Sequence, residues 1–163
     1  MGLPREILMK RIANELQTCS DYLNAEIPFD PKEAKAFPLS VRIDMVNVPG
    51  YVKKGPDVFL ENNHSFMLIL SEEYGFERPG VEWLTPIFHP NIMMPDDGGL
   101  VCLRTASTWE FGSTLLSFIK SIEQLVMAPN PKNPLFTDSC TEASKFFMDN
   151  ESKFEVSISY GGR

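Results

Sequence analysis

The sequence predicts a single α+β domain in which an N-terminal helix precedes a four-stranded antiparallel meander sheet, a long loop and C-terminal helices. Three observations lead to this prediction: helical spacing of apolar residues near the start, consecutive strand-like segments joined by short turns, and renewed helical spacing after an irregular stretch. With 163 residues the chain fits one domain. We take that domain to span residues 1–163, with roughly the last ten residues as a flexible tail.

The first element is an amphipathic helix over residues 4–23. Its apolar positions recur at helical spacing, and Pro4 suits a first helical turn because its missing N–H costs nothing there. Three cations, Arg5, Lys10 and Arg11, lie among the polar positions. They form either a solvated face or a docking face for an acidic partner.

Four strand-like segments follow a proline-rich connector. The first alternates apolar and polar residues, and the second is weaker and is broken at Gly55-Pro56. The third is a short apolar run, and the fourth contains Val81, Trp83 and Ile87. The segments are Leu39–Val48, Tyr51–Leu60, Phe66–Leu70 and Gly80–Phe88.

Residues 92–108 lose all periodicity and contain loop formers, so we expect a long loop on a rigid scaffold, where chemistry tends to be placed. Helical spacing resumes from Ser113 to Met127, with Ser113 as the expected N-cap. A last helix is predicted from Ser139 to Asp149.

Composition excludes several classes of function. The net charge of −7 disfavours nucleic acid as a partner. The three cysteines have no regular spacing, so we expect neither a disulfide framework nor a metal site. No stretch is apolar enough to span a membrane. We therefore expect a cytoplasmic protein, also nuclear if eukaryotic, that is a monomer and does not bind membranes.

The central loop contains the chemically interesting residues. Cys102 follows a Gly-Gly pair and comes after Asn91, whose carboxamide can stabilise an oxyanion. A nucleophilic thiol with an oxyanion donor is what acyl transfer requires. The alternative is a buried structural cysteine. His89 is followed by Pro90, which suits a structural residue better than the free base of a cysteine hydrolase.

At this point the sequence resembles the ubiquitin-conjugating enzymes (UBC fold). The resemblance runs from Arg5 to about Phe147, and it rests on four stretches and one tryptophan. These are Tyr74-Gly75-Phe76-Glu77-Arg78-Pro79, Ile87-Phe88-His89-Pro90-Asn91-Ile92, Leu100-Val101-Cys102-Leu103, Trp109 and Ala128-Pro129-Asn130-Pro131-Lys132-Asn133-Pro134-Leu135.

The resemblance implies a transferase. It would accept ubiquitin or a ubiquitin-like protein from an activating enzyme as a Cys102 thioester and pass it to lysine on substrate proteins, usually with a RING-type ligase. No cofactor is implied, because ATP is consumed upstream by the activating enzyme. A non-catalytic UBC-fold variant that only binds modifier or ligase is the alternative.

Site residues follow from the resemblance by position. Cys102 matches the thioester cysteine and Asn91 the oxyanion asparagine, whereas His89 and Pro90 match residues that orient the loop. Contacts with the activating enzyme or ligase are implied for Arg5, Lys10, Arg11, Phe76, Trp109 and Phe111.

The sequence also departs from the family pattern near the thiol. The segment before Cys102 is lengthened and contains Asp96 and Asp97, while Arg104 and Asn133 stand where the family often has acids. One hypothesis is that Asp96 or Asp97 orients the attacking lysine and takes up its charge. The alternative is that both are solvated loop charges.

Overall fold

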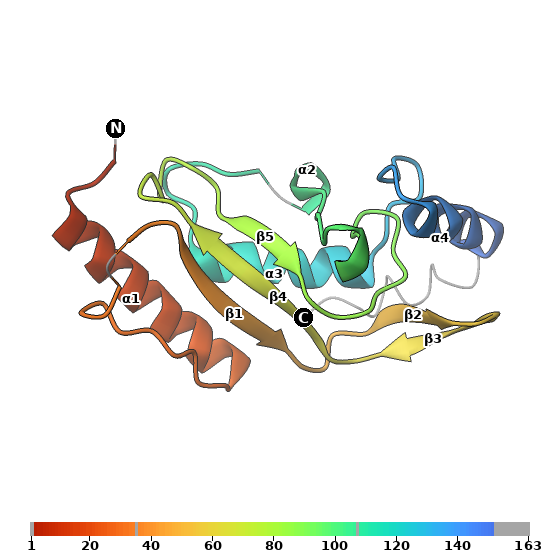
Figure 1. Cartoon of the computed structure of the whole chain (residues 1–163), viewed down its shortest axis with the longest axis horizontal. Coiled ribbons are helices and arrows are strands. Elements are labelled where there is room, and N and C mark those ends of the chain that lie inside the picture. The colour runs from red at the N-terminus through yellow and green to blue at the C-terminus, as the bar shows by residue number, and fades with distance from the viewer. Residues whose placement is uncertain (1, 35, 107, 152–163) are drawn as a thin grey trace.

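The computed structural model describes residues 2–34, 36–106 and 108–151 (Figure 1). Four α-helices, one 3-10 helix and five strands are assigned within these residues. In chain order they are α1 (Arg5–Leu23), β1 (Leu39–Met45), β2 (Gly50–Lys54), β3 (Asp57–Glu61), β4 (His64–Leu70), β5 (Gly80–Trp83), η1 (Pro95–Asp97), α2 (Leu103–Ala106), α3 (Leu115–Met127) and α4 (Asp138–Asp149).

Helix α1 forms where the apolar spacing predicts it. Its buried side includes Leu8, Ile12 and Leu16, which recur every four residues and pack into the main core. The helix ends at Asn24, which adopts the left-handed conformation (φ 52°) that often terminates helices.

The sheet is antiparallel, with strand order β1–β4–β5. Leu39 pairs with Leu70 at one end of the β1–β4 ladder, and Phe66 pairs with Trp83 between β4 and β5. Alternate residues of β1 are buried, in agreement with the alternation in the sequence. The predicted α+β class, with an N-terminal helix, an antiparallel sheet and C-terminal helices, is confirmed.

The second predicted strand differs from the expectation. Tyr51–Leu60 is not one strand of a four-stranded meander but a hairpin of β2 and β3, which forms a separate two-stranded sheet. Gly55 has a φ of +57° and, with Pro56, makes the turn, so Tyr51 pairs with Leu60. β1 consequently pairs directly with β4.

The C-terminal helices have their caps one or two residues from the expected positions. Thr114, not Ser113, caps α3, because its side-chain oxygen accepts the N–H of Ser117. The Ser113 hydroxyl oxygen instead accepts the N–H of Glu110. No helix among the described residues is both long and apolar enough to cross a membrane.

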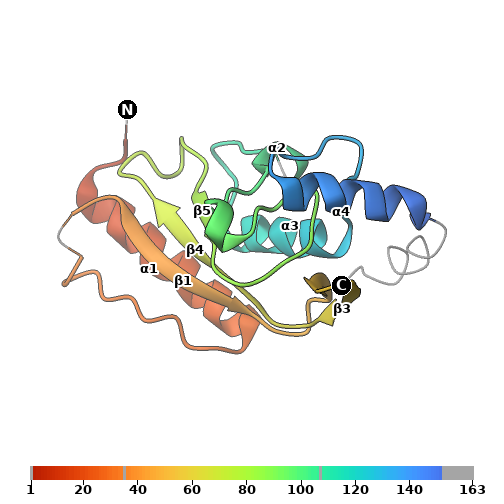
Figure 2. The ribbon, with the colours of Figure 1, turned by 45° about the vertical axis from the view of Figure 1, so that its right-hand side comes forward.

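Two apolar clusters hold these elements together. The larger joins α1, the three-stranded sheet and α3. The smaller centres on Phe88, Ala143 and Phe147, with Tyr51 and Val58 of the β2–β3 hairpin packed against it. Figures 1 and 2 show α1 at one end of the molecule and α4 with the hairpin at the other. The expected flexible tail lies outside the described residues.

Candidate active site

Cys102 lies at the base of a hairpin that spans residues 91–102. Its N–H donates to the carbonyl of Asn91 at 2.9 Å, Ile92 bridges to Val101, and η1 forms the tip. The segment predicted to be an irregular loop is therefore partly paired. The Cys102 side chain is partly exposed and forms no disulfide. The hairpin fixes the main chain of the thiol while leaving the side chain accessible.

The hairpin is attached to the edge of β5. The N–H of Trp83 donates to the carbonyl of Gly99 at 2.8 Å, and Leu100 bridges to Glu82. Gly99 has a φ of +64°, and a Cβ at this position would lie 2.7 Å from the Trp83 carbonyl oxygen. This close approach requires a glycine at position 99, three residues before Cys102.

His89 is buried, and both of its ring nitrogens are engaged. Nδ1 accepts the N–H of Asn91 at 3.0 Å, so Nε2 carries the proton and donates to the carbonyl of Leu125 at 2.6 Å. Burial lowers the pKa of His89 to about 4. The imidazole thus holds the main chain at Asn91 in place and has no free nitrogen for proton transfer to Cys102.

The Asn91 carboxamide is fully buried and fully paired. Nδ2 donates to the carbonyls of Asn130 (3.1 Å) and Asn133 (3.2 Å), and Oδ1 accepts the N–H of Asn130 at 2.8 Å. The N–H of Leu135 donates to the carbonyl of Pro90 at 2.9 Å. These bonds join the hairpin base to the loop between α3 and α4. An oxyanion contact from Asn91 requires one of its two donated bonds to break.

The remaining predicted support residues lie farther out. Asp96 and Asp97 are exposed at the hairpin tip, beyond the three residue steps of paired main chain that lead from Asn91 to Met94. At about 3.3 Å per step, the tip is about 10 Å from the main chain of Cys102. Arg104 is exposed on α2, and Asn133 is exposed and contributes its carbonyl to Asn91. The structure thus places Asn91 and the main chain of Asn133 at the base of the 91–102 hairpin. Asp96 and Asp97 instead lie at the tip of this hairpin.

The predicted partner-contact residues divide into exposed and internal ones. Phe76 and Phe111 are 51% and 54% exposed, and their ring centroids lie 4.7 Å apart. We call these two residues the Phe76–Phe111 patch. Trp109 is partly buried and donates from Nε1 to the carbonyl of Gly75 at 3.2 Å. Trp109 therefore supports the loop that carries Phe76.

The three cations of α1 also differ. Lys10 is exposed, and Arg5 is exposed while donating to the carbonyl of Ala34 at 2.8 Å. Arg11 instead donates from Nε to Glu15 at 2.8 Å and from Nη2 to the carbonyl of Ser113 at 3.1 Å. Arg11 thereby ties α1 to the loop that follows Phe111.

Sequence reasoning missed Glu15. Its Oε1 accepts the Tyr74 hydroxyl at 2.9 Å and the N–H of Leu115 at 2.8 Å, while Oε2 accepts Arg11. One carboxylate thus joins α1, the loop of Phe76 and the start of α3. The available signal was its spacing, because Glu15 lies three residues after Ile12 on the apolar side of the helix.

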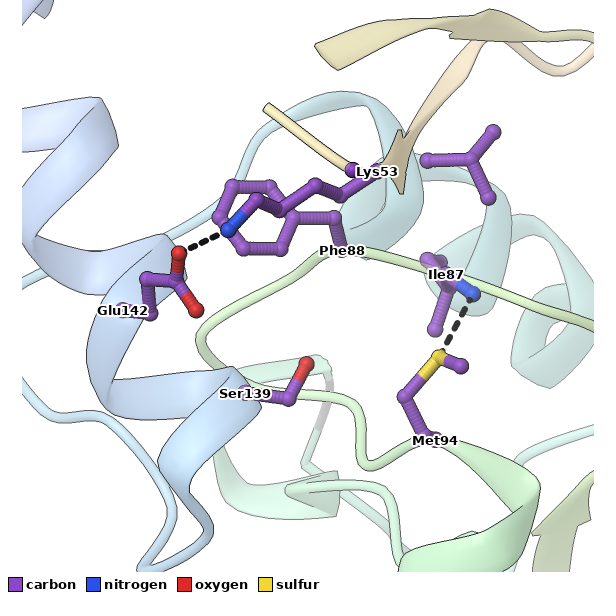
Figure 3. Close-up of a pocket in the computed structure, with 8 residues that line it drawn as sticks. Lys53, Ile87, Phe88, Met94, Ser139 and Glu142 are labelled. Atoms are coloured by element: carbon purple, nitrogen blue, oxygen red, sulfur yellow. Dashed lines mark hydrogen bonds and ion pairs between the residues drawn. The ribbon is translucent and has the colours of Figure 1, made fainter. Parts of the chain in front are cut away.

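A separate pocket of about 270 Å³ opens between the β2–β3 hairpin and α4 (Figure 3). Lys53 and Glu142 form an ion pair across it beside the Phe88 ring, and the N–H of Ile87 donates to the Met94 sulfur at 3.3 Å. None of the predicted site residues lines this pocket. Among the described residues, no group of three His, Cys, Asp or Glu side chains is placed to hold a metal.

Comparison with known proteins identifies the class of protein that this fold and site define. A family model for ubiquitin-conjugating enzymes matches residues 11–160, which is most of the chain. The chain belongs to the ubiquitin-conjugating enzyme family.

Individual relatives agree with this assignment. Ubiquitin-conjugating enzyme E2 T of Homo sapiens is 36% identical over 80 residues, covering 46% of this chain and 39% of the relative. Ubiquitin-conjugating enzyme E2 13 of Schizosaccharomyces pombe is 36% identical over 85 residues, covering 52% of this chain and 53% of the relative. The matched segments therefore span well under two thirds of these relatives' lengths.

Solved structures agree over more of the chain. S. cerevisiae Ubc12 superposes with a TM-score of 0.64 at 26% identity, covering 93% of this chain and 74% of that chain. The E2 domain of a Toxoplasma gondii ubiquitin conjugating enzyme has a TM-score of 0.58 at 19% identity, covering 91% of this chain and 95% of that chain. The second likeness supports the fold alone.

Proposed function

We propose that this protein is an active conjugating enzyme that carries ubiquitin or a ubiquitin-like modifier on Cys102. The observation that carries the proposal is the partly exposed Cys102 thiol at the hairpin base, where its main chain is bonded to Asn91, in a chain of this family. A reactive thiol needs both access and a fixed position. Cys19 and Cys140 are buried, so Cys102 is the accessible thiol among the three.

The proposed reaction has two acyl transfers. In the first, the Cys102 thiolate attacks the thioester between modifier and activating enzyme, a new carbon–sulfur bond forms, and the activating enzyme's thiolate leaves. In the second, a substrate lysine amine attacks, the amide bond forms, the amine loses a proton to water or a neighbouring acceptor, and the Cys102 thiolate leaves. Because one thioester replaces another in the first step, no histidine base is required.

The proposed partners are the modifier, its activating enzyme, a RING-type ligase and substrate proteins. The exposed cations Arg5 and Lys10 on α1 and the Phe76–Phe111 patch would receive the activating enzyme and ligase. ATP would be consumed by the activating enzyme, with no cofactor on this chain. Cysteines that form no disulfide suit a reducing compartment, so we place this function in the cytoplasm.

A charging assay tests the proposal. The protein is incubated with an activating enzyme, Mg²⁺-ATP and each of several modifiers, and we expect a modifier adduct that a reducing thiol removes. Cys102→Ala should abolish the adduct, whereas Cys140→Ala, which removes a buried thiol, should retain it. No adduct with any modifier would instead favour the non-catalytic scaffold, and release of free modifier independent of an amine would favour a hydrolase.

A further inference from the structure

The Phe76–Phe111 patch belongs to two loops that are far apart in the sequence. Phe76 lies in the loop between β4 and β5, and Phe111 lies in the loop before α3. Both rings are about half exposed, and the free energy of one such aromatic pair is no larger than the cost of ordering the main chain of a single residue. The ring contact therefore cannot by itself hold the two loops together. Trp109 adds one hydrogen bond, to the carbonyl of Gly75, and further links run through α1.

The carboxylate of Glu15 links both loops to α1. Its Oε1 accepts the hydroxyl of Tyr74, two residues before Phe76, at 2.9 Å. The same oxygen accepts the N–H of Leu115 at 2.8 Å. Leu115 is the first residue of α3, and an N–H in the first turn of a helix has no acceptor within that helix. One oxygen atom of Glu15 thus fixes one end of each loop relative to α1.

Arg11 extends this link into the loop before α3. Its Nε donates to Oε2 of Glu15 at 2.8 Å, and its Nη2 donates to the carbonyl of Ser113 at 3.1 Å. Its guanidinium carbon lies 5.2 Å from the centroid of the Tyr74 ring and 5.7 Å from that of the Phe111 ring. At these distances a cation is attracted to both rings. Arg11 therefore contacts both loops while Glu15 holds it in place.

The loop between β4 and β5 also approaches Arg11 closely. Gly75 has a φ of +107°, and a Cβ at this position would lie 2.8 Å from Nη1 of Arg11. The side chains of Arg11 and Glu15 are only 22% and 15% exposed. A ligase on the patch would reach the two exposed rings rather than the Glu15 carboxylate. Glu15 can therefore act on ligase binding only through the loops that it holds.

We propose that Glu15 is a positioning residue for ligase-stimulated transfer. Its carboxylate, together with Arg11, holds Phe76 and Phe111 side by side as a preformed binding patch. The role rests on the docking of a RING-type ligase at this patch, which is part of the proposed function. When only a fraction of the molecules has the binding-competent arrangement, the apparent affinity falls by that fraction. Loss of the Glu15 contacts should therefore raise the ligase concentration needed for half-maximal stimulation and leave the maximal stimulation nearly unchanged.

Two conservative substitutions each remove one of these contacts. Tyr74→Phe removes the hydroxyl that donates to Glu15 and keeps the buried ring. Glu15→Gln keeps the shape of the side chain and replaces the charged partner of Arg11 with a neutral amide.

Tyr22→Phe is the matched control. It makes the same chemical change at another tyrosine that bonds a glutamate, because the Tyr22 hydroxyl donates to Glu123 at 2.5 Å. Tyr22 lies seven residues after Glu15 on α1, about 10 Å farther along the helix axis. It contacts neither loop of the patch among the interactions of the described residues.

Single-turnover discharge of the pre-charged protein to lysine, titrated with an isolated RING domain that stimulates the native protein, tests the proposal. Each rate is divided by the unstimulated rate of the same variant, so a general loss of folded protein cancels. Tyr74→Phe and Glu15→Gln should raise the half-stimulating concentration by about fivefold or more and keep the maximal stimulation within about twofold. Tyr22→Phe should match the native protein. An unchanged half-stimulating concentration in both loop variants, or a lowered maximum at an unchanged concentration, would overturn the positioning role.

NMR of the free protein gives a second readout that needs no ligase. The Phe76 and Phe111 ring centroids lie 4.7 Å apart, so nuclear Overhauser effects between the two rings are expected in the native protein. They should weaken in Tyr74→Phe and Glu15→Gln and persist in Tyr22→Phe. Effects of native strength in both loop variants would show that the rings stay together without these contacts, which would contradict the proposal.

Phe76→Ala separates failure of this role from failure of the proposed function. If Phe76→Ala raises the half-stimulating concentration and the Tyr74 and Glu15 variants do not, the patch receives the ligase but Glu15 does not position it. If Phe76→Ala leaves that concentration unchanged, or if no RING domain stimulates the native protein, ligase docking at the patch is itself contradicted.

Discussion

The side chain of Asn91 both accepts a hydrogen bond from the main chain of Asn130 and donates one to it. Oδ1 accepts the Asn130 N–H at 2.8 Å, and Nδ2 donates to the Asn130 carbonyl at 3.1 Å. The two residues are 39 positions apart in sequence. These two bonds attach Asn91, whose carbonyl accepts the N–H of Cys102, to the loop before α4. They therefore fix the position of the 91–102 hairpin on which Cys102 lies.

Asn91→Ala should therefore lower the stability of the fold. Three partly buried hydrogen bonds are lost, so we expect a loss of about 3 kcal/mol at about 1 kcal/mol per bond. Urea unfolding measures the loss. If stability changes by less than about 0.5 kcal/mol while lysine discharge collapses, the residue acts chiefly on the reaction and the anchoring role is wrong.

Burial of His89 should make the fold sensitive to mild acid. The pKa of this imidazole falls from 6.5 to about 4 on folding. Between these values the unfolded chain binds a proton that the folded chain does not, so stability falls as the pH drops from 6.5 towards 4, by about 3 kcal/mol in all. Above pH 6.5 this group contributes no pH dependence. Burial also lowers the pKa of His64, which acts in the same direction.

Urea unfolding at several pH values measures this effect. His89→Gln removes the titrating group, so its stability should depend less on pH over the same window than that of the native chain. Equal slopes in the two proteins would contradict the assignment to His89. The comparison uses slopes, so an overall loss of stability in the variant does not affect it.

Local pattern predicted the elements whose burial follows from their own sequence. Leu8, Ile12 and Leu16 revealed α1, and the alternation from Leu39 revealed β1. The hairpin of β2 and β3 was missed because Gly55-Pro56 is equally compatible with a break in one strand and with a turn between two. Whether β1 pairs with β2 or with β4 depends on contacts between segments that lie far apart in the sequence.

In the candidate site, too, local motifs could be read from the sequence but contacts between distant segments could not. Motif spacing located Cys102 and Asn91, but the bonds of Asn91 to residues 130 and 133 depend on where the α3–α4 loop lies. Arg11 was grouped with the exposed cations, although its guanidinium faces Glu15 and the loop at Ser113. Side-chain direction of this kind requires the tertiary structure, because the same helical position can face solvent or a neighbouring loop.

The 91–102 hairpin also bears on the hypothesis that Asp96 or Asp97 orients the attacking lysine. Because both lie at the tip, about 10 Å from the main chain of Cys102, we expect the double variant Asp96→Asn/Asp97→Asn to discharge to free lysine within about twofold of the native rate. Glu26→Gln/Glu33→Gln makes the same charge change on the exposed connector and serves as control. A fall of about tenfold in the tip variant alone would show that the acids act on the attacking amine.

The Phe76–Phe111 patch provides a test of partner docking that is separate from the chemistry. Phe76→Ala and Phe111→Ala each remove about half-exposed rings, so stability should change by less than about 1 kcal/mol. If the patch receives a ligase, ligase-stimulated discharge should fall by about tenfold or more, whereas unstimulated discharge to free lysine should stay unchanged. Phe136→Ala removes a ring that is 98% exposed and belongs to neither loop, so it is the matched control. Equal loss in all three variants, or loss of unstimulated discharge, would argue against a docking role for the patch.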